Sequence, residues 1–100
     1  MSGEVRVLVY YHADDPEGVL TAYHAVSEEL AEVEGMLGNE LLTSVLAADS
    51  FAVLSRWRDL ASFQIWERGN SHKGSTAALR PFQDTRMGTP FGVYEVSARH

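Results

Sequence analysis

The chain of 100 residues fits one domain, expected to span residues 1–100, with a small core because a chain of this length buries only about two-thirds of its unfolded surface. Hydrophobic residues make up 45% and charged residues 22%, a globular balance that argues against disorder, and no apolar run approaches the roughly 20 residues of a membrane span. The net charge of −6, the scattered basic residues and the absence of cysteine argue against nucleic-acid binding, disulfides and cysteine-ligated metals.

The first segment predicts a strand followed by an amphipathic helix. In residues 4–11, one face carries Val5, Val7, Val9 and Tyr11, and the other carries Arg6, Leu8 and Tyr10. Both faces are largely apolar, so we expect helices on one side and, on the other, a cover that this short chain does not itself supply. Asp15 and Pro16 predict the start of the helix, an apolar stripe follows at steps of three and four residues, and Gly35 is the expected stop.

The middle of the chain predicts a hairpin and a second helix. Two strands are expected at residues 39–47 and 51–58, joined by a tight turn at "AADS", with Phe51, Val53, Ser55 and Trp57 on one face of the second strand. Asp59 is expected to cap a helix whose stripe contains Leu60, Phe63 and Trp66 and which is interrupted at Gly69 and Asn70. The ring of Trp57 is expected to be buried under this helix.

The last third predicts a short helix, a loop and one more strand. The helical piece is expected from Ser71 to Leu79, ended by Pro81, and the strand from Phe91 to Ser97. The order β-α-β-β-α-β predicts an α+β, ferredoxin-like fold, with a four-stranded antiparallel sheet and both helices on one face. The uncovered face would expose apolar side chains, so we expect a homodimer in which two such faces pack together.

Motifs of well-known active sites are absent from the sequence. There is no dinucleotide or phosphate-binding loop, no H-E-x-x-H and no G-x-S-x-G, and the four histidines have no spacing typical of metal ligands. The start, "MSGEVRVLVYYH", lacks the basic stretch and apolar core of a secretory signal, so we expect a cytoplasmic protein with no membrane partner.

Two residues near the end of the second helix are candidates for chemistry. His72 lies where glycines break the helical pattern, and an imidazole with an ordinary pKa near ~6.5 suits proton transfer at neutral pH. Exposure to solvent is an equal alternative for His72. Trp66 either lines a pocket or simply packs in the core, as aromatic residues at helical spacing usually do.

Phenol and guanidinium groups are candidates for binding a substrate. Tyr10, Tyr11 and Tyr94 come from the first and last strands, and we expect them to border a cleft between helices and sheet, where a hydroxyl orients an aromatic molecule. Tyr10 and Tyr94 are the preferred candidates. Arg86, in the loop before the last strand, is expected either to cover the mouth of the pocket and stabilise an oxyanion or to be solvated.

The stretch "FAVLSRWRDLASFQIWERGNSHKGSTAALRPF", Phe51 to Phe82, resembles the antibiotic biosynthesis monooxygenase family. Members show a strand ending in Trp and a polar residue, then a helix with an aromatic residue, a Trp and a following His. Trp57, Phe63 and Trp66 stand in that order here, and "VEGMLGNELLTSV", Val33 to Val45, is similar to the helix end, glycine turn and second strand of the family.

The resemblance implies a dimeric α+β barrel with one pocket in each subunit. One branch of the family oxidises aromatic polyketides with molecular oxygen and without metal or flavin, and it implies that His72 accepts a proton, Tyr10 or Arg86 donates to the oxyanion, and Trp66 forms a wall or donates from its indole. The other branch binds and degrades heme, but "VRVLVYYH" lacks the first-strand Asn of that branch and Trp66 lies closer to His72 than expected. We therefore expect a monooxygenase without a cofactor. The alternatives are a binding or accessory dimer without chemistry and a protein that binds heme.

Overall fold

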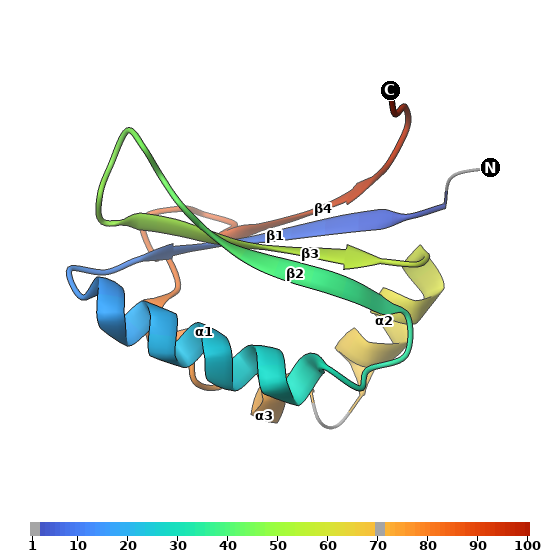
Figure 1. Cartoon of the computed structure of the whole chain (residues 1–100), viewed down its shortest axis with the longest axis horizontal. Coiled ribbons are helices and arrows are strands. Elements are labelled where there is room, and N and C mark those ends of the chain that lie inside the picture. Colours follow the sequence, from blue (N-terminus) through green and yellow to red (C-terminus); the bar gives the residue numbers. More distant parts are fainter. Residues whose placement is uncertain (1–2, 70–71) are drawn as a thin grey trace.

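Four antiparallel strands form one sheet, and the helices lie on one side of it (Figure 1). The structure, a computed structural model, describes residues 3–69 and 72–100, except for the side chains of residues 72 and 73. The strands are β1 (Val5–His12), β2 (Met36–Thr43), β3 (Ser50–Trp57) and β4 (Phe91–Glu95). Their order across the sheet is β2-β3-β1-β4, as two interleaved β-α-β units require, so the predicted ferredoxin-like α+β fold is confirmed.

Two helices begin at the aspartates that the sequence indicates. The side chain of Asp15 accepts a hydrogen bond from the backbone N–H of Gly18 at 3.0 Å and caps α1 (Pro16–Leu30). Asp59 accepts from the N–H of Ser62 at 2.8 Å and caps α2 (Leu60–Arg68). Both bonds satisfy N–H groups that have no partner within the helix, and both predicted caps are confirmed.

The ends of α1 and β4 differ from the prediction. The helix α1 ends at Leu30 rather than near Gly35, although Val33 still packs against the core. Gly35 instead makes the turn into β2 with a φ of 87°, and a Cβ atom there would overlap the side chain of Ser62. The last strand, β4, ends at Glu95 rather than at Ser97.

The hairpin between β2 and β3 also has a longer connection than predicted. The first strand was expected to run to residue 47, but β2 ends at Thr43 because Ser44 forms its own turn. Its hydroxyl accepts hydrogen bonds from the backbone N–H groups of Leu46 and Ala47, at 3.1 Å each. The connection rises on the side of the sheet away from α1 (Figure 1) and exposes Val45 and Leu46 almost completely.

The segment between α2 and β4 is less helical than predicted. The helix α3 (His72–Ser75) is a single turn, and Pro81 lies within a 3-10 helix, η1 (Arg80–Phe82), rather than ending an α-helix. Gly74 and the hydroxyl residues after it have low helix propensity, which explains the short α3. The predicted break at Asn70 and the predicted start at Ser71 lie outside the described residues.

The core lies between the sheet and the helices. Its largest fully buried side chains are those of Trp57, Leu79, Val5 and Val19. Trp57, at the end of β3, packs its ring against Phe63 of α2, as the sequence predicts. Leu79 belongs to none of the predicted stripes, yet it is 1% exposed because the turns after α3 fold it under α1.

The other face of the sheet has no helix over it in the part of the chain that the structure describes. Paired residues of antiparallel strands point to the same side, so the registers Leu8 with Leu54 and Tyr10 with Ala52 identify this face. We call it the open face and define its apolar part by the residues Leu8, Tyr10, Leu42, Leu54 and Tyr94. Leu42 is 40% exposed and Tyr94 is 55% exposed, so the bare apolar surface expected from the sequence is present.

Candidate active site

A cavity of about 230 Å³ lies between the sheet and the helices. Its apolar wall is formed mainly by Val7, Val26, Leu30, Trp57, Phe63 and Trp66. It lies between two hydrophobic clusters, one around Tyr11 and Leu79 and the other around Trp57 and Phe63, and Trp66 packs against both. The chain therefore leaves room for a molecule at the junction of its two core clusters.

Three aromatic rings meet at one end of this cavity. The ring centroids of Trp57 and Phe63 lie 5.4 Å apart in an edge-on arrangement, and those of Trp57 and Trp66 lie 5.3 Å apart. The indole N–H of Trp57 donates to the hydroxyl of Ser55 at 2.9 Å, which fixes the orientation of its ring. Trp66 is partly buried, packs against the core and also lines the cavity. The two interpretations of Trp66 from the sequence, core packing and pocket lining, are therefore compatible.

Polar groups line the rest of the cavity: Tyr11, Ser55, Glu67, Thr76, Arg80 and Gln83. Tyr11 is 6% exposed, and burial raises the pKa of its phenol to about 12, while the positive charge of Arg80 lowers it less strongly. This phenol therefore stays protonated at neutral pH and can donate a hydrogen bond. Glu67 and Arg80 are exposed side chains, so the cavity is open to solvent where they lie.

The predicted site residues are not all brought together. Trp66 lines the cavity, whereas Tyr10 and Tyr94 lie on the open face and are not among its lining residues. The side chain of Tyr94 covers Gly92, where a Cβ atom would meet its ring within 3 Å. The expected position of Tyr10 and Tyr94 at the cleft therefore differs from the structure, because side chains alternate along a strand. The side chain of His72 lies outside what the structure describes.

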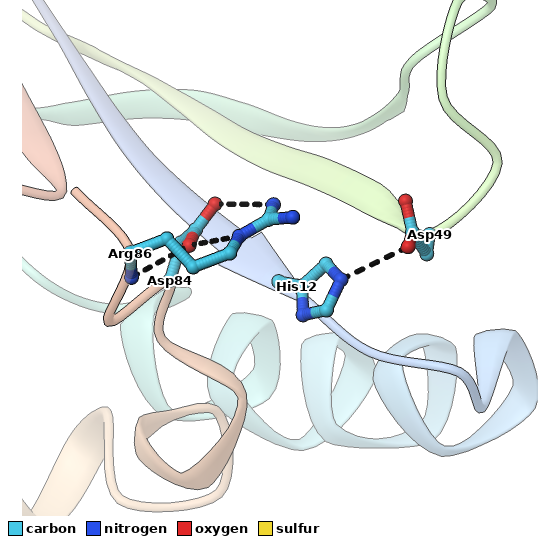
Figure 2. Close-up of polar contacts among 4 residues, drawn as sticks. All are labelled: His12, Asp49, Asp84 and Arg86. Carbon is cyan, nitrogen blue, oxygen red and sulfur yellow. Dashed lines mark hydrogen bonds and ion pairs between the residues drawn. The ribbon is translucent and has the colours of Figure 1, made fainter.

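Arg86 also lies outside the lining of the cavity. Its guanidinium holds both carboxylate oxygens of Asp84, Nε to Oδ1 and Nη2 to Oδ2, each at 2.9 Å (Figure 2). The side chain of Asp84 is 8% exposed, and the bonds from Arg86 lower the pKa of this carboxyl to about 2. Beside this pair, Nε2 of His12 lies 2.9 Å from Oδ2 of Asp49. Arg86 is thus engaged in a structural ion pair rather than at the cavity.

Sequence reasoning missed Arg80, Gln83 and Glu67 because they come from turns or helix ends with no periodic pattern. The sequence did contain a signal that Tyr11 lines the covered side of the sheet. The alternation in β1 places Tyr11 on the same face as Val5 and Val7, which is the face that the helices cover, and Tyr10 on the other.

Two kinds of feature are missing from the described residues. No three or more His, Asp or Glu side chains come close enough together there to hold a metal ion. None of the helices described is both long and apolar enough to cross a membrane.

Solved structures with the same fold include proteins from bacteria and archaea. A single-residue variant of SnoaB, described as a cofactor-independent oxygenase from Streptomyces nogalater, superposes with a TM-score of 0.82 at 15% identity, covering 98% of this chain and 97% of that one. A conserved protein from Methanosarcina mazei gives a TM-score of 0.73 at 17% identity, covering 91% and 90%. A protein of unknown function from Bacteroides thetaiotaomicron gives 0.68 at 14% identity, covering 96% and 100%. At these identities the likeness establishes the fold.

The family is established by the sequence itself. A search of curated proteins finds no match. The family model described as "Antibiotic biosynthesis monooxygenase" matches residues 5–77, which span the chain from β1 through α3 and include the aromatic wall of the cavity. The chain therefore belongs to the antibiotic biosynthesis monooxygenase family.

Proposed function

We propose that this protein is a small monooxygenase that oxidises an aromatic molecule of the quinol or polyketide type with molecular oxygen, using neither metal nor flavin. The observation that carries the proposal is the cavity of about 230 Å³ walled by Trp57, Phe63 and Trp66 in a chain of this family. An enclosed aromatic wall with a few polar groups is the usual form of a site for a flat apolar ligand. The description of SnoaB as a cofactor-independent oxygenase agrees with the proposed chemistry.

The size of the cavity limits the substrate. An apolar cavity of about 150 Å³ holds benzene, so about 230 Å³ accommodates one ring or two fused rings, with larger ligands extending toward solvent where the exposed residues Arg80 and Glu67 lie. The volume lies below the roughly 300–1,000 Å³ of pockets for drug-sized ligands. A cavity of this volume is too small to enclose heme, so we favour the small aromatic substrate.

In the proposed reaction the substrate itself supplies the electrons. A base removes an acidic proton, and the resulting carbanion or phenolate transfers electrons to oxygen. One oxygen atom enters the product and the other leaves as water. On an anthrone a ring CH₂ becomes C=O, so CH₂ and O₂ give C=O and H₂O. On a quinol a ring C–H becomes C–OH while the two phenol groups become carbonyls, so the hydroquinone and O₂ give the hydroxyquinone and H₂O. We propose His72 as the proton acceptor and Trp66 as the wall against which the ring stacks. Action in the cytoplasm stays a prediction from the sequence.

We further propose that the protein works as a homodimer joined through the open face. Leu42 and Tyr94 expose apolar surface there, and the β2–β3 connection, which contains the exposed residues Val45 and Leu46, rises on the same side of the sheet (Figure 1). A second copy would remove this surface from water and leave the cavity, on the opposite side of the sheet, accessible.

Oxygen uptake tests the proposed activity. With anthrone or 1,4-dihydroxynaphthalene, in the presence of a chelator, the protein should consume oxygen faster than the uncatalysed oxidation. Trp66→Phe should lower kcat/KM about tenfold, and His72→Ala should lower it by about 100-fold or more, the usual contribution of a general base. His24→Ala is the matched control, because His24 is exposed on α1 beside Tyr23 and does not line the cavity.

The results also separate an enzyme from a binding or accessory dimer. Saturable binding of these compounds without any oxygen uptake would reject the monooxygenase and favour a binding protein. Oxygen uptake that neither Trp66→Phe nor His72→Ala changes would reject the assignment of these two residues.

A further inference from the structure

The cavity has two chemically different ends along β1. Val7 belongs to the cluster of Trp57 and Phe63, and Tyr11 belongs to the other cluster. Four residues of a strand span about 13 Å, so the phenol and the aromatic wall lie at separate ends of the lining. A ligand whose ring stacks on the wall would point its substituent toward Tyr11.

Tyr11 lines this end of the cavity with a side chain that is almost fully buried. Among the residues that the structure describes, none forms a hydrogen bond with the hydroxyl of Tyr11. The hydroxyl of Tyr23, by contrast, donates to Oδ1 of Asn39 at 2.6 Å. Buried tyrosines usually find a partner, so the group available to Tyr11 is an oxygen or nitrogen atom of whatever occupies the cavity.

The charge beside Tyr11 indicates what kind of atom that is. Arg80 lines the same cavity, and its positive charge acts on the phenol of Tyr11. The raised pKa of Tyr11 keeps its proton in place, so Tyr11 is a neutral donor and Arg80 a permanent cation. A neutral donor and a cation together favour an oxygen that carries negative charge.

Glu67 is the acidic residue of the lining and acts against an anion. It belongs to α2, next to Trp66, and α2 packs over the aromatic end through Phe63. The two charged residues of the lining belong to different elements, Arg80 to η1 and Glu67 to α2. A ligand whose anionic oxygen points toward Tyr11 and Arg80 places its neutral ring, rather than its charge, at the aromatic end beside Glu67.

We propose that Tyr11 and Arg80 form the specificity-determining pair of the cavity and select aromatic ligands that carry an ionised oxygen, namely phenolates or enolates. The inference rests on the proposed function, because it names the form in which the substrate of that reaction binds. In this role the pair holds the substrate as its oxygen anion, which is the electron-rich form that molecular oxygen oxidises. Tyr11 and Arg80 replace Tyr10 and Arg86 as the donors to the oxyanion.

The ionisation of bound 4-nitrophenol tests the pair without requiring turnover. This one-ring phenol changes its visible absorbance when it loses its proton. In the unmodified protein the pKa of the bound phenol should fall below that of the free phenol. Tyr11→Phe and Arg80→Gln should each raise it by about one unit, which corresponds to a tenfold loss of preference for the anion. Nitrobenzene, a neutral analogue, should bind all three proteins equally in equilibrium dialysis.

Two control variants remove the same kinds of chemical group from residues outside the cavity. Tyr10→Phe removes a phenol on the open face, and Arg86→Gln removes a guanidinium that binds Asp84, so both should leave the pKa of bound 4-nitrophenol unchanged. Circular dichroism of each variant checks that it is folded.

The outcomes separate this inference from the proposed function. If bound 4-nitrophenol ionises as in water, or if Tyr11→Phe and Arg80→Gln match the unmodified protein, the pair does not select anions and the inference is overturned. Equal losses in nitrobenzene binding would overturn it too, since they indicate a purely structural role. A clear preference for the anion without oxygen uptake by any substrate would instead sustain the inference and reject the monooxygenase.

Discussion

The role of a single residue in this protein depends on the face of the sheet on which it lies and on the residues that it contacts. Tyr10 and Tyr11 are neighbours in the sequence with the same side chain, but one lies on the open face and the other lines the cavity. Arg80 and Arg86 also differ in place, because Arg86 binds Asp84 outside the cavity whereas Arg80, which donates to Oγ1 of Thr76 at 3.0 Å, lines the cavity. Residue type alone therefore does not identify a site here.

The carboxylate of Asp84 should make the stability of the protein depend on pH under acidic conditions. Its bonds to Arg86 lower its pKa from 3.8 to about 2. The group therefore stabilises the fold above about pH 4, and this contribution is lost as the pH falls from about 4 to about 2. In urea unfolding, Asp84→Asn should remove part of the loss of stability that the unmodified protein shows in this window.

Glu29→Gln is the matched control for Asp84→Asn, since Glu29 is an exposed carboxylate on α1. Its urea midpoint should follow the pH as in the unmodified protein. If Asp84→Asn gives the same pH profile as Glu29→Gln, the ion pair of Asp84 and Arg86 contributes nothing to the acid response.

At the scale of elements, the helix α2 is the part of the fold that builds the aromatic wall. It is short, with nine residues, and it carries Phe63 and Trp66 on the side that meets the sheet. A helix of this length depends on packing and on its cap rather than on its own propensity. The conformation at Asp59 therefore affects both the stability of the protein and the shape of the cavity.

Asp59→Ala should lower the melting temperature by about 5 °C, because the N–H of Ser62 loses its acceptor. It should also weaken the binding of nitrobenzene, because α2 would fray at the end that precedes Phe63. Asp59→Asn is the control, since asparagine caps helices about as well as aspartate and should restore most of both losses. Equal effects of the two substitutions would argue for the charge of Asp59 rather than for its hydrogen bond.

At the scale of the whole molecule, the sheet has one covered and one bare face. The bare face is the open face, with Leu54 paired to Leu8 near its middle. We expect sedimentation at micromolar concentration to give twice the 11.1 kDa mass of one chain. Leu54→Glu should raise the dimer dissociation constant about 100-fold or more, because it places an unpaired charge in the contact.

Ile65→Glu provides the control for that substitution. Ile65 is also a large exposed apolar residue, 74% exposed, but it lies on α2 away from the open face. The dimer should therefore persist in Ile65→Glu. A monomeric unmodified protein, or equal dissociation in both variants, would rule out the open face as the interface.

The sequence by itself determined the fold class, the two helix caps, the burial of Trp57 and the bare apolar face, because alternation, helical spacing and capping act over a few neighbouring residues. It predicted less well the end of α1, the turn at Ser44 and the short α3, where local hydrogen bonds and low helix propensity decide.

The composition of the cavity was decided only by the tertiary structure. Tyr11 from β1, Trp66 from α2 and Arg80 from η1 are far apart in the chain, and they meet because two core clusters pack over the same sheet without filling the space between them. Packing of this kind depends on the shapes of side chains in three dimensions, which no periodic pattern along the chain records.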